Sequence, residues 1–336
     1  MRPFFTTAAV AILLAGFAPD DQRAPDQSEE RLVEPATAAL DSSSAFPKPN
    51  ATIPTKNGDL RVERLAALEE PWGMAFLPDG RLLITEKPGR LRIFSDGKLS
   101  APVGGVPAVV YFGQGGLLDV AVDPNFAQNQ MIYLSYAEAA KPQPPGVRET
   151  LEPRLAAFQR MEDQVLKGGA VARARLDGGA LRDVTVIWRQ VPKTVGRGHF
   201  SGRLAFAPDG TLFIASSDRM RFDPAQDLAS NLGKIVRINT DGSAPRDNPF
   251  VTDRGARPEV WSTGHRNPSG MAFQPGMVRL WSVEFGPKGG DELNLVERGR
   301  NYGWPLVNEG LNYDDSPIPR HATRPEFSDS SAAGRQ

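Results

Sequence analysis

The sequence predicts an all-β protein of the β-propeller class, on three observations. A strand, a turn and a second strand recur four times along the chain, with similar residues at corresponding positions. The 336 residues include 33 Gly and 30 Pro, a combined share well above the roughly 12% of average usage, so turns are frequent and long helices are few. The turn prolines lie 46, 84 and 67 residues apart. A unit of about 40–50 residues with several strands is typical of a propeller blade.

The four repeats share an apolar strand that ends in a turn containing Pro or Gly. They are GMAFLPDG before RLLITE (73–86), GLLDVAVDP before MIYLSY (116–136), GRLAFAPDG before TLFIAS (202–216) and GMAFQPG before VRLWS (270–282). We expect a third strand in three of them, at 89–94, 170–175 and 233–238. A pair of β-sandwiches is the alternative fold. The repeat disfavours it, because sandwich strands need not resemble one another.

The long interval between the second and third repeats holds an insertion over residues 141–169. Its middle, residues 148–166, combines helix-forming residues with apolar side chains at Leu151, Leu155 and Phe158. This spacing predicts a short helix that lies outside the blade.

We assign the propeller to residues 52–327 and expect both ends of the chain to lie outside it. Residues 1–18 carry a positive charge, a short apolar run and then small residues, which is the pattern of a secretory signal; a buried helix is the alternative. Because no lipoprotein cysteine follows, the expected location is periplasmic or secreted. Residues 19–51 mix Pro, Ser, Ala and acidic residues like a disordered tether, and residues 328–336 form a polar tail.

Composition excludes several classes of partner and chemistry. The 39 Lys and Arg nearly balance the 40 Asp and Glu, so no electrostatic signal points to nucleic acid or to an anionic membrane surface. The apolar run near the N-terminus is too short for a transmembrane segment. The absence of Cys excludes disulfides, zinc–thiolate sites, iron–sulfur clusters and a thiol nucleophile.

Polar residues directly before the repeated strands are candidates for a site, because loops between propeller strands gather at the mouth of the central channel. His199 and His265 both follow glycine-rich approaches to a strand. A histidine there acts as a general base or makes a structural hydrogen bond. Gln114 supplies an amide in a third such loop, or caps its turn. Arg266 and Asn267 place a fixed cation beside an amide, although a salt bridge to a neighbouring blade is the alternative for Arg266.

The stretch EFGPKGGDELN at 284–294 is a candidate calcium site. Gly286 and Pro287 in an irregular loop leave backbone carbonyl oxygens free, and Asp291 and Glu292 add carboxylates nearby. Oxygen ligands of this kind suit Ca²⁺. An acidic, solvated turn is the alternative.

Six motifs, taken in order, resemble the soluble sugar dehydrogenases that depend on pyrroloquinoline quinone (PQQ). These enzymes form the glucose/sorbosone dehydrogenase family, and the resemblance is closest to its aldose sugar dehydrogenase branch. The match runs from about residue 60 to about residue 327. The motifs are PWGMAF (71–76), GQGGLLD (113–119), GHFSGRL (198–204), GHRNPSG (264–270), EFGPKGGDELN (284–294) and NYGWP (301–305).

The resemblance implies a six-bladed propeller, about four blades of which are recognisable here, that binds PQQ and Ca²⁺ on its axis. It implies oxidation of an aldose sugar at C1 to a lactone, with electrons passing on to an acceptor such as a quinone or a dye. His199 falls where the family has its general base, and Gln114 matches the glutamine that contacts the sugar. Arg266 and Asn267 match the pair that contacts the cofactor, where Arg266 stabilises negative charge developing on the quinone.

The metal ligands implied by the resemblance fall in two groups. Gly286 and Pro287 match the residues whose carbonyl oxygens hold the catalytic Ca²⁺. Glu292 and the carbonyl of Tyr302 match a second, structural Ca²⁺ site. Three residues depart from the family pattern. Gly198 stands before the base, where some members carry a carboxylate or amide, Ser201 replaces a glycine in the same loop, and Phe285 replaces a polar residue beside the calcium loop.

The largest departure is the length of the chain after the last motif. The family continues with roughly two further blades, which bring a Lys and an Arg to the cofactor carboxylates, whereas this chain ends in a polar stretch. We therefore expect an incomplete propeller, truncated at the C-terminus. An inactive remnant or binding module, and a calcium-dependent lactonase-type propeller hydrolase, are the two alternative functions. The sequence specifies neither the preferred sugar nor the oligomeric state.

Overall fold

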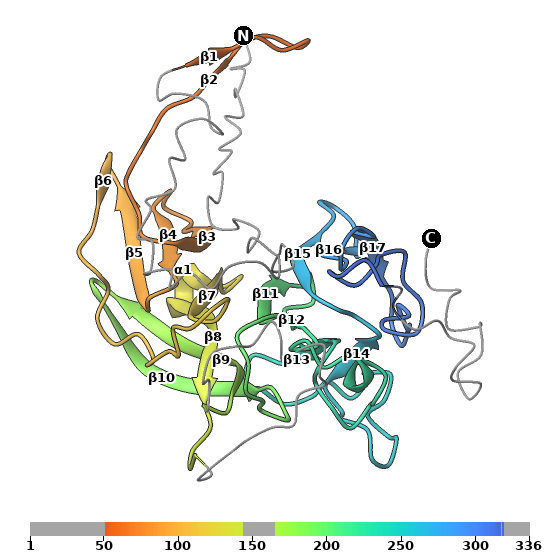
Figure 1. The fold of residues 1–336 in the computed structure, drawn as a ribbon. Helices are drawn as coiled ribbons and strands as arrows, with labels where there is room; N and C mark the ends of the chain where they lie inside the picture. Colours follow the sequence, from red (N-terminus) through yellow and green to blue (C-terminus); the bar gives the residue numbers. More distant parts are fainter. Residues whose placement is uncertain (1–50, 144–164, 317, 319–336) are drawn as a thin grey trace, which may run out of the picture.

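Four antiparallel sheets follow one another along the chain in the computed structural model, which describes residues 51–143, 165–316 and 318. Each sheet is a propeller blade, and the blades lie side by side around a common centre (Figure 1). The first strands of successive blades contact one another, β3 with β7, β7 with β11, and β11 with β15. The predicted all-β propeller with four recognisable blades is confirmed, and the sandwich alternative is wrong.

Strands within each blade pair in chain order, so each blade is a simple meander. The first blade consists of β3 (Pro71–Phe76), β4 (Leu82–Glu86), β5 (Arg90–Ser95) and β6 (Lys98–Leu99). The second consists of β7 (Leu117–Val122), β8 (Met131–Ala139), β9 (Lys167–Asp177) and β10 (Ala180–Arg189). The third consists of β11 (Ser201–Phe206), β12 (Leu212–Ser216), β13 (Lys234–Ile238) and β14 (Val260–Thr263). The fourth consists of β15 (Pro268–Phe273), β16 (Leu280–Glu284) and β17 (Glu292–Val296).

Small elements accompany the blades. The strands β1 (Thr52–Ile53) and β2 (Leu60–Arg61) form a separate two-stranded sheet. The one-turn helix α1 (Phe126–Asn129) joins β7 to β8, and the 3₁₀ turn η2 (Asp223–Ala225) lies between β12 and β13. None of these four elements was expected from the sequence, because each is too short to show a period.

The predicted third strands correspond to β5, β9 and β13, whereas β17 is a correction. Gly286 and Pro287 lie in the irregular segment between β16 and β17, as expected, but a third strand of the fourth blade was not expected and begins at Glu292. The strand has only five residues and follows the glycines at 286, 289 and 290 directly, so the sequence offered little to mark it.

Glycine at the hairpin turn between the first two strands of a blade is required by the backbone. Gly80 and Gly210 have φ angles of +88° and +83°, a region that residues with a Cβ rarely adopt. A Cβ at either position would meet no atom within 4 Å, so space is not the constraint. The repeated Pro-Asp-Gly pattern that predicted these turns therefore has a conformational cause.

The core lies between the faces of neighbouring blades rather than in one central layer. One cluster packs the first blade on the second and includes Leu83, Leu91 and Leu134. A second cluster joins the second blade to the third, and a third cluster joins the third to the fourth. Full burial of a leucine contributes on the order of 2 kcal/mol, so these faces hold the blades in fixed relative positions.

Several predicted segments fall outside the described residues. They are the secretory signal (1–18), all but the last residue of the tether (19–51), all but the last two residues of the helical insertion (148–166) and the polar tail (328–336). Within the part of the chain that the structure describes, no helix is both long and apolar enough to cross a membrane.

Candidate active site

The candidate residues gather at one end of the blades because they occupy equivalent places in the repeat. Gln114 precedes β7, His199 precedes β11, and Arg266 and Asn267 directly precede β15. Since the second strand of each blade runs antiparallel to the first, residues that follow β4, β12 and β16 come to the same end. The site thus combines residues that precede the first strand of a blade with residues that follow the second strand.

His199 forms a buried pair with Asp218, which follows β12. The Nδ1 of His199 lies 2.7 Å from Oδ1 of Asp218, and the two side chains are 7% and 0% exposed. Asp218 also accepts hydrogen bonds from the backbone N–H of Met220 (2.8 Å) and from Nε1 of Trp304 (2.8 Å). A carboxylate with this set of donors fixes the histidine tautomer with its proton on Nδ1, which leaves Nε2 with a lone pair. Among the described residues, Nε2 has no hydrogen-bond partner.

The electrostatics keep this histidine neutral. Burial lowers the pKa of His199 below its ordinary value, the charge of Arg266 lowers it further, and Asp218 opposes the change without reversing it. Burial alone would raise the pKa of Asp218, but His199, Arg266 and the Met220 N–H together hold it below its ordinary value. The pair is therefore an uncharged imidazole beside an ionised carboxylate, as a general base requires.

The loop that carries His199 is held in an unusual backbone conformation. His199 and Ser201 have φ angles of +50° and +56°, in the left-handed region that suits glycine, and each costs on the order of 1 kcal/mol. A glycine at position 201 would avoid that cost. Gln114 helps to hold the loop, because its Oε1 accepts the backbone N–H of His199 at 2.7 Å.

Arg266 is buried, 5% exposed, and its guanidinium is only partly satisfied. Its Nη1 donates to the carbonyls of Phe285 (2.9 Å) and Gly286 (2.7 Å), and Nη2 lies 3.3 Å from the hydroxyl of Tyr313. Its Nε has no partner among the described residues. A buried donor without a partner costs about 1–3 kcal/mol, so the site leaves one donor available to an acceptor that a ligand would bring.

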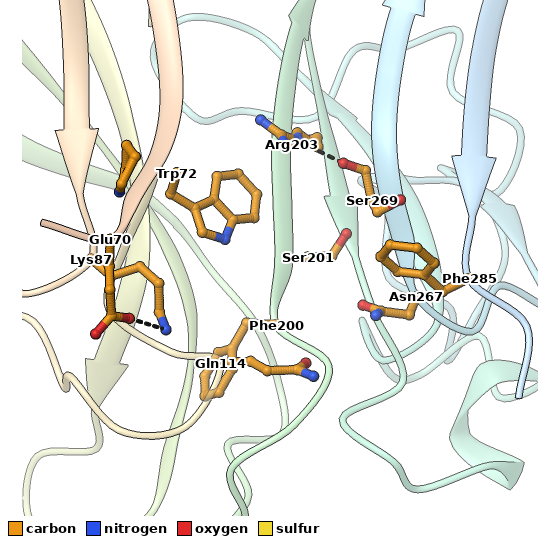
Figure 2. A pocket seen from close by; sticks show the side chains of 11 residues that line it. Glu70, Trp72, Lys87, Gln114, Phe200, Ser201, Arg203, Asn267, Ser269 and Phe285 are labelled. Carbon is orange, nitrogen blue, oxygen red and sulfur yellow. Dashed lines mark hydrogen bonds and ion pairs between the residues drawn. The ribbon is translucent and has the colours of Figure 1, made fainter. Parts of the chain in front are cut away.

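A pocket of about 210 Å³ opens between the first and fourth blades (Figure 2), and its lining includes Phe200 and Asn267, which directly follow His199 and Arg266 in the sequence. Figure 2 shows Trp72 and the Glu70–Lys87 ion pair on one side, Asn267 and Phe285 on the other, and Gln114 and Phe200 between them. Of the predicted site residues, Gln114 and Asn267 line the pocket directly. The complete lining is Glu70, Pro71, Trp72, Lys87, Gln114, Phe200, Ser201, Arg203, Asn267, Ser269 and Phe285.

One pocket residue, Arg203 on β11, contacts all the other blades. Its guanidinium lies 4.0 Å from the centre of the Trp72 ring in the first blade. It pairs with Asp119 of the second blade at 3.5 Å and donates to the carbonyl of Ser269 in the fourth at 2.6 Å. The pocket wall is therefore fixed by a cation that no motif had marked as a site residue.

The chemistry of the pocket fits a flat, anionic, aromatic cofactor. Trp72, Phe200 and Phe285 supply aromatic side chains to the lining. Its charged groups are Arg203 and the Glu70–Lys87 ion pair, and Arg266 directly precedes the lining residue Asn267. The unpartnered Nε of Arg266 is a donor suited to a quinone oxygen or carboxylate. PQQ matches this donor set.

The calcium loop provides oxygen ligands but little negative charge. A Cβ at Gly286 would lie 2.2 Å and 2.4 Å from the carbonyl oxygens of Gly289 and Gly290, so only glycine fits where these carbonyls converge. Asp291 accepts the N–H of Gly286 at 2.9 Å and closes the loop. The Gly286 carbonyl already accepts from Arg266. The described residues contain no group of three or more His, Cys, Asp or Glu placed for a metal. Carbonyl ligation fits Ca²⁺ here when an anionic cofactor supplies charge.

Glu292 and Tyr302, the candidates for a second calcium site, lie on either side of a buried pair formed by His265 and Glu284. Glu292 faces Glu284 across the β16–β17 ladder. Tyr302 stacks on the ring of His265 with 4.6 Å between ring centres. Glu292 accepts from Nδ2 of Asn294 at 3.0 Å, and both oxygens of Glu284 accept from residues 265–267.

The two histidines that the sequence left equivalent have different environments. His265 is 0% exposed, with both ring nitrogens bonded inside the protein, to Glu284 and Ser262. It is not a candidate base. The sequence pattern singled out neither Asp218 nor Glu284. Each follows or ends the second strand of its blade, 19 residues after its histidine, and only the hairpin brings the partners together.

Comparison with known proteins gives consistent matches over most of the chain. The sequence model of a family described as glucose/sorbosone dehydrogenase matches residues 68–335. The aldose sugar dehydrogenase YliI of Escherichia coli is 44% identical over 256 residues, which is 75% of this chain and 63% of the relative. Quinoprotein glucose dehydrogenase B of Acinetobacter calcoaceticus is 30% identical over 78% of this chain and 55% of its own length. The chain thus spans less than two thirds of these two relatives.

Solved structures show the same similarity in three dimensions. The apo form of the soluble aldose sugar dehydrogenase of Escherichia coli superposes with a TM-score of 0.67 at 43% identity, covering 75% of this chain and 67% of that one. The PQQ-bound aldose sugar dehydrogenase of Streptomyces coelicolor superposes with a TM-score of 0.59 at 30% identity, covering 75% of this chain and 68% of that one.

Proposed function

Because the chain belongs to the glucose/sorbosone dehydrogenase family, we propose that it is an exported dehydrogenase that uses PQQ and Ca²⁺ to oxidise aldose sugars at C1 to lactones. The observation that carries the proposal is the neutral His199 paired with Asp218, its Nε2 unpaired among the described residues, beside a pocket suited to an aromatic anion. A relative described as a quinoprotein and a similar structure with PQQ bound support the choice of cofactor. Export and the periplasmic or secreted location rest on the N-terminal sequence pattern.

In this proposal the protein's own residues bind the sugar and move a proton. Nε2 of His199 takes the proton of the C1 hydroxyl while the C1 hydrogen leaves as hydride, so that C1–O becomes the lactone carbonyl. Asp218 stabilises the imidazolium that results. The amide of Gln114 orients the sugar. Arg266 and Asn267 would hold PQQ, which would supply the hydride acceptor, and the carbonyls of Gly286 and Pro287 would hold Ca²⁺, which would supply Lewis-acid polarisation.

The test is sugar-dependent reduction of a dye by the purified chain after PQQ and Ca²⁺ are added. We expect reduction with both additions, and loss of activity when a chelator removes Ca²⁺. Binding of PQQ without oxidation of any aldose would identify a binding module instead. Hydrolysis of a lactone without PQQ would identify the hydrolase alternative.

The pH dependence follows from the environment of His199. Burial, reinforced by the charge of Arg266, lowers the pKa of His199, and a base works only while unprotonated. We therefore expect kcat/KM to stay constant as pH falls through about 6.5, the ordinary pKa of histidine, and to decline only at lower pH. A profile of kcat/KM between pH 4 and 8, at saturating PQQ, measures it. An acid limb centred at or above about 6.5 would contradict the neutral, buried base.

A further inference from the structure

Glu284, the last residue of β16, places both oxygens of a buried carboxylate on the loop that precedes β15. The residue is 4% exposed. Its Oε1 accepts the backbone N–H groups of Arg266 and of Asn267, the latter at 3.2 Å. Its Oε2 accepts from Nδ1 of His265 at 3.0 Å. One carboxylate therefore binds three consecutive residues, two of which are the candidate cofactor ligands.

His265 in turn fixes the orientation of that carboxylate. Its Nε2 lies 2.8 Å from Oγ of Ser262, and its ring stacks on Tyr302 at an interplanar angle of 24°. With Nδ1–H donating to Glu284, Nε2 accepts from the serine hydroxyl. Serine, histidine and glutamate in this order resemble a hydrolytic triad. Ser262 and His265 are both 0% exposed, so no substrate reaches them and their role is support.

The same two segments are joined by further hydrogen bonds. The N–H of Phe285 donates to the carbonyl of Asn267 at 3.2 Å, and the guanidinium of Arg266 returns to the carbonyls of Phe285 and Gly286. Glu284 thus connects two backbone segments. Its carboxylate holds the Arg266–Asn267 loop, and in the sequence it directly precedes the candidate calcium loop.

We propose that Glu284 is a positioning residue of the cofactor site, acting through the backbone of Arg266 and Asn267, with His265 and Ser262 holding its carboxylate in place. The proposal rests on the proposed function for the identity of the cofactor. Removal of the carboxylate leaves two buried backbone N–H groups without acceptors. The Arg266–Asn267 loop then moves, and its two side chains no longer point at the cofactor. Side chains displaced by about 1 Å bind and act poorly, even when the fold survives.

The chain offers a matched control in Glu86. It is the last residue of β4, the equivalent strand of the first blade, and it is 1% exposed. Its carboxylate also accepts a backbone N–H, that of Glu69 at 2.6 Å, and pairs with Arg90 and Arg92. Glu86→Met removes an equally buried carboxylate without touching Arg266 or Asn267.

The experiment compares Glu284→Met and Glu284→Gln in two measurements, with Glu86→Met as a control in the second. The first is PQQ affinity by equilibrium titration with Ca²⁺ present, where we expect Glu284→Met to weaken binding by about 10- to 100-fold. Glu284→Gln restores most of the affinity, because its amide oxygen still accepts the two N–H groups while His265 changes tautomer. Glu86→Met serves as the control in the exchange measurement only, because Glu86 adjoins Lys87 and holds the N–H of Glu69 beside the pocket. No loss for Glu284→Met, or an equal loss for Glu284→Gln, would overturn the proposal.

The second measurement, amide hydrogen exchange at residues 266 and 267, does not need the cofactor. We expect exchange there to accelerate at least about tenfold in Glu284→Met and to stay unchanged in Glu86→Met and Glu284→Gln. If the wild-type chain bound no PQQ, the proposed function would fail while this comparison still decided whether Glu284 holds the loop. Unchanged exchange at both amides in Glu284→Met would refute the positioning role.

Discussion

Replacement of His199 by alanine is expected to reduce the rate of aldose oxidation by about 10²- to 10⁴-fold, the usual contribution of a positioned general base. The structure gives the reason. The hydrogen bond from Nδ1 to Asp218 leaves Nε2 of His199 with a free lone pair. Burial and the charge of Arg266 lower the pKa of the ring and so keep it neutral. We expect the substitution to lower kcat rather than PQQ affinity, because in this proposal Arg266 and Asn267, and not His199, contact PQQ. Steady-state dye reduction at saturating PQQ and Ca²⁺ measures it.

A second variant separates catalysis from folding. Alanine leaves a cavity beside a buried carboxylate, whereas His199→Asn retains an N–H that can donate to Asp218. Both variants should be equally inactive, with the asparagine variant close to wild type in thermal unfolding and PQQ affinity. Wild-type rates in either variant would show that another group takes the proton.

Asp218→Asn is expected to lower kcat by about 10²- to 10⁴-fold although no atom of Asp218 touches the sugar. The carboxylate accepts from His199, Met220 and Trp304, and an amide offers one oxygen for these three donors. When the amide N–H₂ faces His199, the ring must carry its proton on Nε2 and cannot act as a base. Loss of the negative charge also lowers the pKa of His199, so the acid limb of the rate profile should move to lower pH.

The control for this substitution is Asp123→Asn. Asp123 is 6% exposed and bonds to Tyr133 and Asn129 at the β7–β8 turn, outside the pocket lining. We expect its activity and its pH profile to match the wild type, apart from a modest loss of stability. If Asp218→Asn and Asp123→Asn had the same small effect on kcat, the tautomer argument would be wrong.

How much the sequence could predict depended on where a residue lies in the repeat. Gln114, His199, Arg266 and Asn267 stand next to the first strand of a blade, in glycine-rich motifs that local pattern makes visible. Asp218 follows the second strand of its blade in a segment that no motif covers, and Glu284 begins the motif EFGPKGGDELN, in which only the later residues were chosen as candidates. Arg203 contacts three other blades, and no local pattern encodes such a contact. The strand β17 was missed because it has only five residues and directly follows a glycine-rich loop.

The two histidine–carboxylate pairs also show how far the sequence alone can predict the site. His199–Asp218 and His265–Glu284 have equal sequence separations in consecutive blades, yet one borders the pocket and the other is sealed beneath Tyr302 and Ser262. Burial comes from the residues packed around each ring, which depend on the whole assembly. The residue pattern alone left two candidate bases, and the family resemblance singled out His199. The tertiary structure adds that both ring nitrogens of His265 are bonded inside the protein.

The contacts of Arg203 have a consequence for how the molecule comes apart. The guanidinium contacts an indole, a carboxylate and a carbonyl, each from a different blade, so it loses one contact when any one of those blades moves away and all three when its own blade does. Local opening of a single sheet is thereby coupled to the others, and subglobal unfolding units extend across blade boundaries. The pocket forms only while all four sheets are docked. A ligand that binds in it therefore stabilises the docked arrangement of the blades, and its affinity depends on how completely they assemble.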